Sequence, residues 1–560
     1  MRGTKLLARS LCVLAIGALC AGAAAAGTAA TPIQHVVVIF QENVSFDHYF
    51  ASYPNAANPA GEPQFFAQPG TPTVNGLTGA LLTNNPNKNN STNVPQINPF
   101  LLDRSQASTC DQDHNYGDEQ LAFDGGVMDL FPASVGVGES AFCLDQYSYG
   151  MGNAIVEGYF DGNTVTAMWN YAQNYALNDN FYGTTFGPST PGVLNLVAGT
   201  TYPATVSAAS AKIANPVGLT GTLTGDLDPA GDVCSGSPTI QMGGQNIGNL
   251  LSAQGLSWGS FMGGFDLTIT NPNGTTGCKR SSPATAANDI TNFPPQPGDN
   301  NFTADYIPHH AFFNYWSSTA NPTHARPTVA PSEYGMFSST GPGTTDAANH
   351  NYDTNDFFAA LNAGNLPAVS FLKAPANMDG HAGYSDPLLE QEFVVDVINA
   401  VESSDFWSST AVIITWDDSD GWYDHQMGPI VNPSAWTQTA FTPTSNRQNS
   451  DQLNGLGKCG NGTPLNNIEG RCGYGPRIPM LVISPYAKTN FVDHTLTDQS
   501  SIIHFIEDNF LGGQRIGGGS FDAISGSLEN MFDFSQKVNP GHRHQVLLDP
   551  STGLVTGGHK

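Results

Sequence analysis

Short apolar segments, each followed by a polar stretch, recur along the chain. They are rich in β-branched residues, they show no helical period, and they are bounded by Asn, Pro, Gly and Thr. Runs of this kind are typical of strands that are buried on both faces of a mostly parallel sheet. The predicted strands cover residues 35–40, 366–372, 411–416 and 479–484.

Amphipathic helices are predicted between these strands. Residues 164–176, 386–402 and 498–510 repeat apolar positions with the helical period, and Asp498 stands where a capping residue is expected. Strands that alternate with helices predict an α/β fold, in which helices sandwich a mostly parallel central sheet. Segments rich in Asn, Pro, Gly and Thr are predicted as long loop insertions; they are 52–100, 200–246, 267–300, 317–349 and 426–476.

The N-terminus has the pattern of a secretory signal peptide. Arg2, Lys5 and Arg9 precede an apolar run and then a stretch of small residues that ends near Ala26. A membrane anchor is the alternative, but the apolar run is shorter than the roughly 20 residues that span a bilayer. The sequence therefore predicts a signal peptide at 1–26, a single domain with insertions at 27–560, no transmembrane segment, and export to the periplasm or the medium.

The charge balance limits the partners. The chain of 560 residues carries 47 acidic and 19 basic side chains, for a net charge of −28. Proteins that coat DNA or RNA recruit phosphates with Lys and Arg, so a nucleic-acid partner is not expected. Six cysteines follow residue 26, and an even number in an exported chain suggests disulfides. Neighbours in the sequence give the simplest pairing: 110–143, 234–278 and 459–472.

Two predicted strands run directly into polar side chains that suit a cation. Glu42 and Asn43 follow the first strand, and Asp417 and Asp418 follow the third. Ligands of open α/β sheets bind beyond the carboxyl ends of strands, and hard oxygen donors suit a divalent metal ion. The alternative is that these acids cap helices or face water, although adjacent carboxylates repel each other unless a cation lies between them.

A candidate nucleophile lies in the segment 186–192. Thr190 before Pro191 has the pattern of a helix N-cap, which would place Ser189 just outside a helix N-terminus. Backbone N–H groups and the helix dipole favour anions there, and a nearby metal ion lowers the pKa of a hydroxyl. The alternative is an ordinary helix start without a catalytic role.

Histidines in loop-like segments complete the candidate chemistry. His114, His309, His310 and His381 stand among Asp, Gly and Pro residues, and each alone is more often a surface or hydrogen-bonded residue than a catalytic group. The adjacent pair at 309–310 suggests a loop that directs both rings at an anion. The sequence lacks the metalloprotease, P-loop, dinucleotide-binding and nucleophile-elbow motifs, which weakens those interpretations.

Taken together, these motifs resemble the bacterial phosphoesterase family of acid phosphatases and phospholipases C, within the alkaline-phosphatase-like superfamily. The resemblance covers roughly residues 33–535. The matching segments are 36–50, 113–114, 123–129, 179–191, 305–310, 379–387, 415–425 and 475–485.

The resemblance implies metal-dependent phosphoryl transfer through a covalent phosphoserine. It assigns the nucleophile to Ser189, the phosphate surroundings to His114, His309, His310 and His381, and the metal ligands to Glu42, Asn43, Ser189, Asp417 and Asp418. Two positions depart from the family pattern: Val44 replaces a usual Arg, and Asp418 stands where many relatives have Glu. Cationic histidines, with an ordinary pKa of about 6.5, would favour acidic pH.

The leading hypothesis is a secreted acid phosphatase that hydrolyses small phosphomonoesters. The phospholipases of this family usually carry further β-rich domains, and only a short tail follows Phe534. The first alternative is a phospholipase C for phosphatidylcholine, in which Trp416, Trp422 and Tyr423 could cage the quaternary ammonium. The second is a secreted binding protein with a degenerate site. The identity of the metal and the oligomeric state stay open.

Overall fold

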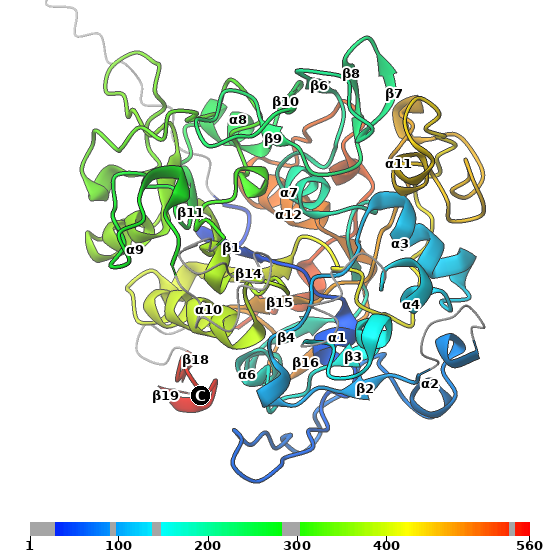
Figure 1. The fold of residues 1–560 in the computed structure, drawn as a ribbon. Coiled ribbons are helices and arrows are strands. Elements are labelled where there is room, and N and C mark those ends of the chain that lie inside the picture. Colours follow the sequence, from blue (N-terminus) through cyan, green and yellow to red (C-terminus); the bar gives the residue numbers. More distant parts are fainter. Residues whose placement is uncertain (1–28, 90–96, 137–146, 283–302, 537–543, 560) are drawn as a thin grey trace, which may run out of the picture.

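A computed structural model describes residues 29–89, 97–136, 147–282, 303–536 and 544–559. The predicted signal peptide and Cys143 lie outside these residues. The centre of the fold is an eight-stranded mixed sheet between two layers of helices (Figure 1). Its strands, in spatial order, are β12 (Asn351–Asp353), β11 (Trp258–Met262), β13 (Val369–Lys373), β1 (His35–Gln41), β14 (Thr410–Trp416), β15 (Met480–Ile483), β4 (Ala176–Asn178) and β16 (Phe491–Asp493).

The five strands from β12 to β14 are parallel, and β15 pairs antiparallel with both β14 and β4. The predicted mostly parallel α/β sandwich is therefore confirmed. All seven residues of β14 are buried, as expected for a strand covered by helices on both faces. The predicted strand at 366–372 begins only at β13 Val369, because Pro367 has no N–H to give to a ladder.

Helices cover both faces of the sheet (Figure 1). One layer holds α7 (Ser189–Ala198), α8 (Ile247–Ala253) and α12 (Ser500–Phe510); the other holds α6 (Thr166–Asn174), α9 (Thr354–Asn362) and α10 (Pro387–Glu402). The three predicted helices are present with shifted ends. Asp386 caps α10, and Asp498 Oδ2 accepts from Ser500 N at 3.1 Å at the start of α12.

The segment 200–246, predicted as a loop, instead contains all the strands of a second, five-stranded sheet. Its strands are two to five residues long and contain Pro and Gly, so they lack the continuous apolar pattern that identifies a buried strand. In spatial order they are β7 (Ile213–Val217), β8 (Thr220–Leu223), β6 (Ala204–Val206), β10 (Thr239–Met242) and β9 (Asp228–Pro229).

Two disulfides stabilise the described part of the chain, Cys234–Cys278 and Cys459–Cys472, and both match the predicted pairing. The third predicted pair involves Cys143 and is not described. None of the helices in the described segments combines the length and the apolar character that a bilayer-spanning helix needs.

The N-terminal turn of α7 lies directly against the end of β14. A Cβ atom added at Gly192 would lie 2.3 Å from the carbonyl oxygen of Asp417, closer than atoms in contact can approach. Gln499 Nε2 donates to the same carbonyl oxygen at 2.6 Å. Glycine at 192 therefore permits the close approach of a helix N-terminus to a strand end.

We expect Gly192→Ala to destabilise the protein by about 1–3 kcal/mol, because the added methyl group pushes α7 away from β14. In a helix without this contact, alanine in place of glycine stabilises the protein by up to about 1 kcal/mol. A loss of stability therefore indicates the clash with β14, and a gain indicates that the methyl group meets no obstacle. Urea unfolding measures it. The control is Gly341→Ala, where the nearest atom is 3.8 Å away, and equal midpoints for the two variants would contradict the proposed packing.

Candidate active site

Three parallel strands end at one place in the centre of the sheet. The register pairs Gln41 of β1 with Trp416 of β14, so the residues that follow, Glu42 and Asp417, are neighbours. On the other side β1 pairs with β13 up to Leu372, and Lys373 comes next. The register therefore brings two carboxylates and one ammonium group together.

Ser189 reaches this cluster from the first turn of α7. Its Oγ donates a hydrogen bond to Glu42 Oε2 at 3.0 Å, and both side chains are buried. The helix starts two residues earlier than predicted, since Pro188 and not Thr190 is the N-cap. Thr190 Oγ1 donates to the carbonyl of His309 at 3.3 Å, so the structure brings Ser189, and not Thr190, into contact with the carboxylates.

The second oxygen of Glu42 faces two nitrogen atoms. His310 Nδ1 lies 3.1 Å from Glu42 Oε1, and the Lys373 ammonium forms an ion pair with the same oxygen. Lys373 Nζ also lies 3.2 Å from Asp417 Oδ2. The two oxygens of Glu42 thus connect Ser189 on one side with His310 and Lys373 on the other.

The carboxylates fit a divalent cation. Ligand atoms of Glu42, Asp417 and Asp418 lie within 4.8 Å of one another. Asp418 Oδ2 and Asn43 Oδ1 are buried without a hydrogen-bond partner among the described residues, and a buried oxygen of this kind is costly unless something binds it. Hard oxygen donors in this number suit an ion such as Mg²⁺, Mn²⁺ or Ca²⁺.

Burial makes these carboxyl groups hold protons when no cation is bound. It raises the pKa of Glu42 to about 7, against the opposing effect of Lys373, and it raises the pKa of Asp418 to about 8. Burial and the charge of Glu42 also place the pKa of Asp417 well above its ordinary range. A bound cation would take the place of these protons.

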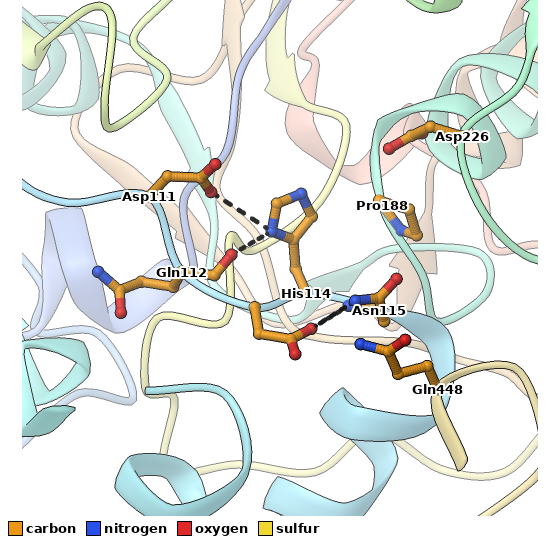
Figure 2. A pocket seen from close by; sticks show the side chains of 8 residues that line it. Asp111, Gln112, His114, Asn115, Pro188, Asp226 and Gln448 are labelled. Carbon is orange, nitrogen blue, oxygen red and sulfur yellow. Dashed lines mark hydrogen bonds and ion pairs between the residues drawn. The ribbon is translucent and has the colours of Figure 1, made fainter. Parts of the chain in front are cut away.

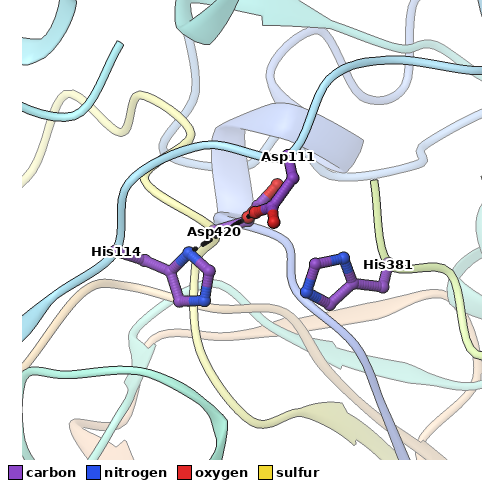
Figure 3. A group of neighbouring side chains, drawn as sticks. All are labelled: Asp111, His114, His381 and Asp420. Carbon is purple, nitrogen blue, oxygen red and sulfur yellow. Dashed lines mark ion pairs between the residues drawn. The ribbon is translucent and has the colours of Figure 1, made fainter. Parts of the chain in front are cut away.

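His114 and His381 lie close together beside the carboxylates of Asp111 and Asp420 (Figure 3), with ring centroids 6.1 Å apart. His114 Nδ1 is 3.2 Å from Asp420 Oδ1, and its Nε2 is 3.5 Å from Asn43 Nδ2. Burial would lower the pKa of His114, but Asp418 and Asp420 outweigh burial and raise the pKa well above its usual value. His114 is therefore a partly exposed cation at the wall of the site.

The other histidines differ in charge and in position. Burial, together with the charge of His114, lowers the pKa of His381 to about 3, and burial with the charge of His309 lowers that of His310. Both rings are neutral, unlike the cationic histidines that the sequence suggested. His309 is 31% exposed, and its Nδ1 lies 3.6 Å from Asp228 Oδ1 at the edge of the site.

A cavity of about 340 Å³ opens beside His114 and Pro188, the residue before the candidate nucleophile (Figure 2). Three carboxylates, those of Asp111, Asp113 and Asp226, line it. Asp226 Oδ1 accepts the Thr190 backbone N–H at 2.8 Å and so occupies one donor at the N-terminus of α7.

The aromatic residues considered for an ammonium cage pack inside the protein. Trp416 Nε1 donates to Glu390 Oε1 at 2.6 Å, and Trp422 stacks on His48 with centroids 3.9 Å apart. Tyr423 lies edge-on against the ring of Phe131. All three proposed cage residues are at most 3% exposed, so they form no open cage.

Sequence reasoning missed several charged residues of the site. Lys373 comes directly after the predicted strand 366–372, and the rule that located Glu42 and Asp417 at strand ends would have found it. Asp420, two residues after Asp418, holds the His114 ring in place. Asp226 lies in a segment that gave no periodic signal.

Comparison with known proteins identifies the family. The model of the phosphoesterase family matches residues 33–511, and the chain belongs to this family. Phospholipase C A of Mycobacterium tuberculosis is 23% identical over 548 residues, which cover 92% of this chain and 81% of that protein. The non-hemolytic phospholipases C of Pseudomonas aeruginosa and Burkholderia pseudomallei are 29% and 32% identical over 32% and 31% of this chain.

The matched region spans only 25% and 23% of the length of the latter two relatives. Among solved structures, murine ectonucleotide pyrophosphatase/phosphodiesterase 5 is similar with a TM-score of 0.29 and 10% identity, over 66% of this chain and 95% of that one. A protein of the alkaline phosphatase superfamily from Vibrio parahaemolyticus is similar with a TM-score of 0.25 and 13% identity, over 62% and 60%.

The raised carboxyl pKa values predict that the metal-free protein loses stability as the pH rises. Glu42 and Asp418 bind protons more tightly in the folded than in the unfolded chain. The free energy of unfolding that this proton binding contributes is therefore fully present below a pH of about 4, and it is lost as the pH rises through about 7 to 8. Urea unfolding with a chelator should show this fall, and adding Mn²⁺ should reverse it at pH 8.

Glu402 provides a matched control, because burial raises its pKa to about 8 while its carboxylate bonds to Tyr175 and not to the site. Glu402→Gln should flatten part of the pH dependence and leave the Mn²⁺ effect intact. Glu42→Gln should weaken the Mn²⁺ effect. A chelated protein whose stability is constant from pH 4.5 to 8 would contradict this assignment.

Proposed function

We propose that this protein is a metal-dependent phosphoric ester hydrolase that uses Ser189 as its nucleophile. The observation that carries the proposal is the buried contact of Ser189 Oγ with Glu42 Oε2, at the N-terminus of a helix and beside three carboxylates. A structural serine gains nothing from this position, whereas a nucleophile gains a fixed orientation and a place beside a cation. Membership of the phosphoesterase family supports the proposal.

A divalent cation held by Glu42, Asn43, Asp417 and Asp418 would lower the pKa of the Ser189 hydroxyl and balance charge on a phosphoryl group. Ser189 Oγ then attacks phosphorus in line, the alcohol leaves, and water hydrolyses the phosphoserine.

The neighbouring side chains supply the remaining positive charge and hydrogen-bond donors. His114 presents a cationic ring to the phosphoryl oxygens, and its bond to Asp420 holds that ring in place. His381 and His310 are neutral, and the one N–H of each ring is directed away from the phosphoryl group: His381 Nδ1 faces the Ala382 carbonyl oxygen, and His310 Nδ1 faces Glu42 Oε1. The raised pKa of His114 keeps its ring protonated at pH values at which a free histidine is neutral. We therefore propose that activity extends from acidic to neutral pH.

Small phosphomonoesters are our first proposal for the substrate. The cavity beside Ser189 is polar and small, and the candidate cage residues are buried. Phosphatidylcholine is the second candidate, favoured by the relative named phospholipase C A that matches 92% of the chain.

We also infer that the protein is exported. The pattern of residues 1–26 and the two described disulfides, which persist in oxidising compartments, support this proposal.

We expect Ser189→Ala and Asp417→Ala to lower kcat/KM for an aryl phosphate by at least about 1000-fold, because they remove the nucleophile and a cation ligand. The matched control is Thr190→Val, which keeps a side chain of similar shape and should retain most of the activity. The assay runs from pH 5 to 8 with an aryl phosphate and, in parallel, with phosphatidylcholine vesicles. Monoesterase activity that survives both substitutions would refute the mechanism; choline phosphate release alone would favour the second substrate.

Acid quenching of the enzyme during turnover of ³²P-labelled aryl phosphate should trap label on Ser189. Mass spectrometry of the peptide that contains residues 186–192 locates the label, and Ser189→Ala should carry none. Phosphate on Thr190, or label on a histidine after a parallel alkaline quench, would show that the nucleophile is assigned wrongly.

A further inference from the structure

Glu42 belongs to two groups of possible metal ligands at once. One group is Glu42, Asp417 and Asp418; the other is Glu42, His310 and Asp379. In each group the ligand atoms lie within 4.8 Å of one another, and all of these side chains are buried. A carboxylate shared by two donor groups is the arrangement of a two-cation centre, in which the ions lie about 3.5–4 Å apart.

Lys373 lies where the second group would need its cation. Its ammonium forms an ion pair with Glu42 Oε1, the oxygen that lies 3.1 Å from His310 Nδ1. The same ammonium is 3.2 Å from Asp417 Oδ2, which belongs to the first group. One lysine nitrogen therefore contacts a carboxylate of each group.

We propose that the Lys373 ammonium takes the place of the second metal ion of this centre. The wild-type chain then binds one divalent ion, and a chain without Lys373 binds two. The inference rests on the cation site proposed above. In this role Lys373 is a positioning residue. It bridges Glu42 Oε1 and Asp417 Oδ2, while the other oxygen of Glu42, Oε2, faces Ser189.

The surroundings of Lys373 fit a fixed cation. Its side chain is 1% exposed, and its ammonium lies 5.3 Å from the centre of the Phe40 ring. The two carboxylates that contact the ammonium, those of Glu42 and Asp417, are the counter-ions that a buried lysine needs.

The charge balance also favours a single divalent ion beside the lysine. Four buried carboxylates surround the centre, those of Glu42, Asp379, Asp417 and Asp418. One divalent ion and one ammonium bring this set close to neutrality. A second divalent ion next to the ammonium would be repelled, whereas an ion that replaced the lysine would meet Glu42, His310 and Asp379 as ready ligands.

Metal stoichiometry tests the proposal on the full-length purified protein. Equilibrium dialysis against Mn²⁺, followed by metal analysis, should give one Mn²⁺ per chain for the wild type and for Lys373→Arg. Lys373→Ala should bind two, and its electron paramagnetic resonance spectrum should show a spin-coupled pair that the wild type lacks. The double variant Lys373→Ala/His310→Ala should return to one, because it removes a ligand of the new position.

Each outcome is informative. Two Mn²⁺ ions per wild-type chain would overturn the role of Lys373 and leave the cation site intact, whereas none would overturn the cation site itself. One Mn²⁺ in a folded Lys373→Ala protein, as judged by circular dichroism, would also overturn the proposal. If the alanine variant does not fold, Lys373→Met decides, because it keeps the length of the side chain and removes its charge: two Mn²⁺ per chain would support the proposal, and one would refute it.

Discussion

The carboxylate of Glu42 is the contact on which the arrangement of the site depends. It stands at the end of the central strand β1, and its two oxygens face Ser189 on one side and His310 with Lys373 on the other. A helix start, a loop and a neighbouring strand are therefore all positioned relative to one side chain. Because that side chain is fully buried in the sheet centre, the site inherits the rigidity of the core.

The placement of positive charge explains how a chain with a net charge of −28 can bind a phosphoester. Lys373 is buried and His114 is largely covered, and each is held by carboxylates, so neither creates a basic surface. The acids at the predicted strand ends indicated a metal ion, and the carboxylate cluster supports that expectation. The composition gave no sign that one of the few lysines lies inside this cluster.

The apolar pattern predicted the strands β1, β13, β14 and β15 and the helix α10, because continuous burial and a capping Asp leave clear signals. The strand-end rule then located Glu42 and Asp417 without any structure.

Other features could not be predicted, because they depend on tertiary contacts. The five-stranded sheet is held by pairing between short strands with little apolar pattern. The start of α7 follows from packing against β14, and the charge of His114 depends on Asp420, which is distant in sequence.

The close approach at Gly192 has a consequence for the choice of metal ion. Backbone atoms, and not flexible side chains, set the separation between the start of α7 and the end of β14. The backbone positions at the start of α7 and the end of β14 are therefore fixed, and only side-chain rotation can adapt the ligand atoms to different ionic radii. Oxygen ligands lie at about 2.0–2.1 Å from Mg²⁺ and about 2.3–2.6 Å from Ca²⁺, so a fixed backbone separation favours the ion whose ligand distances the side chains reach without strain.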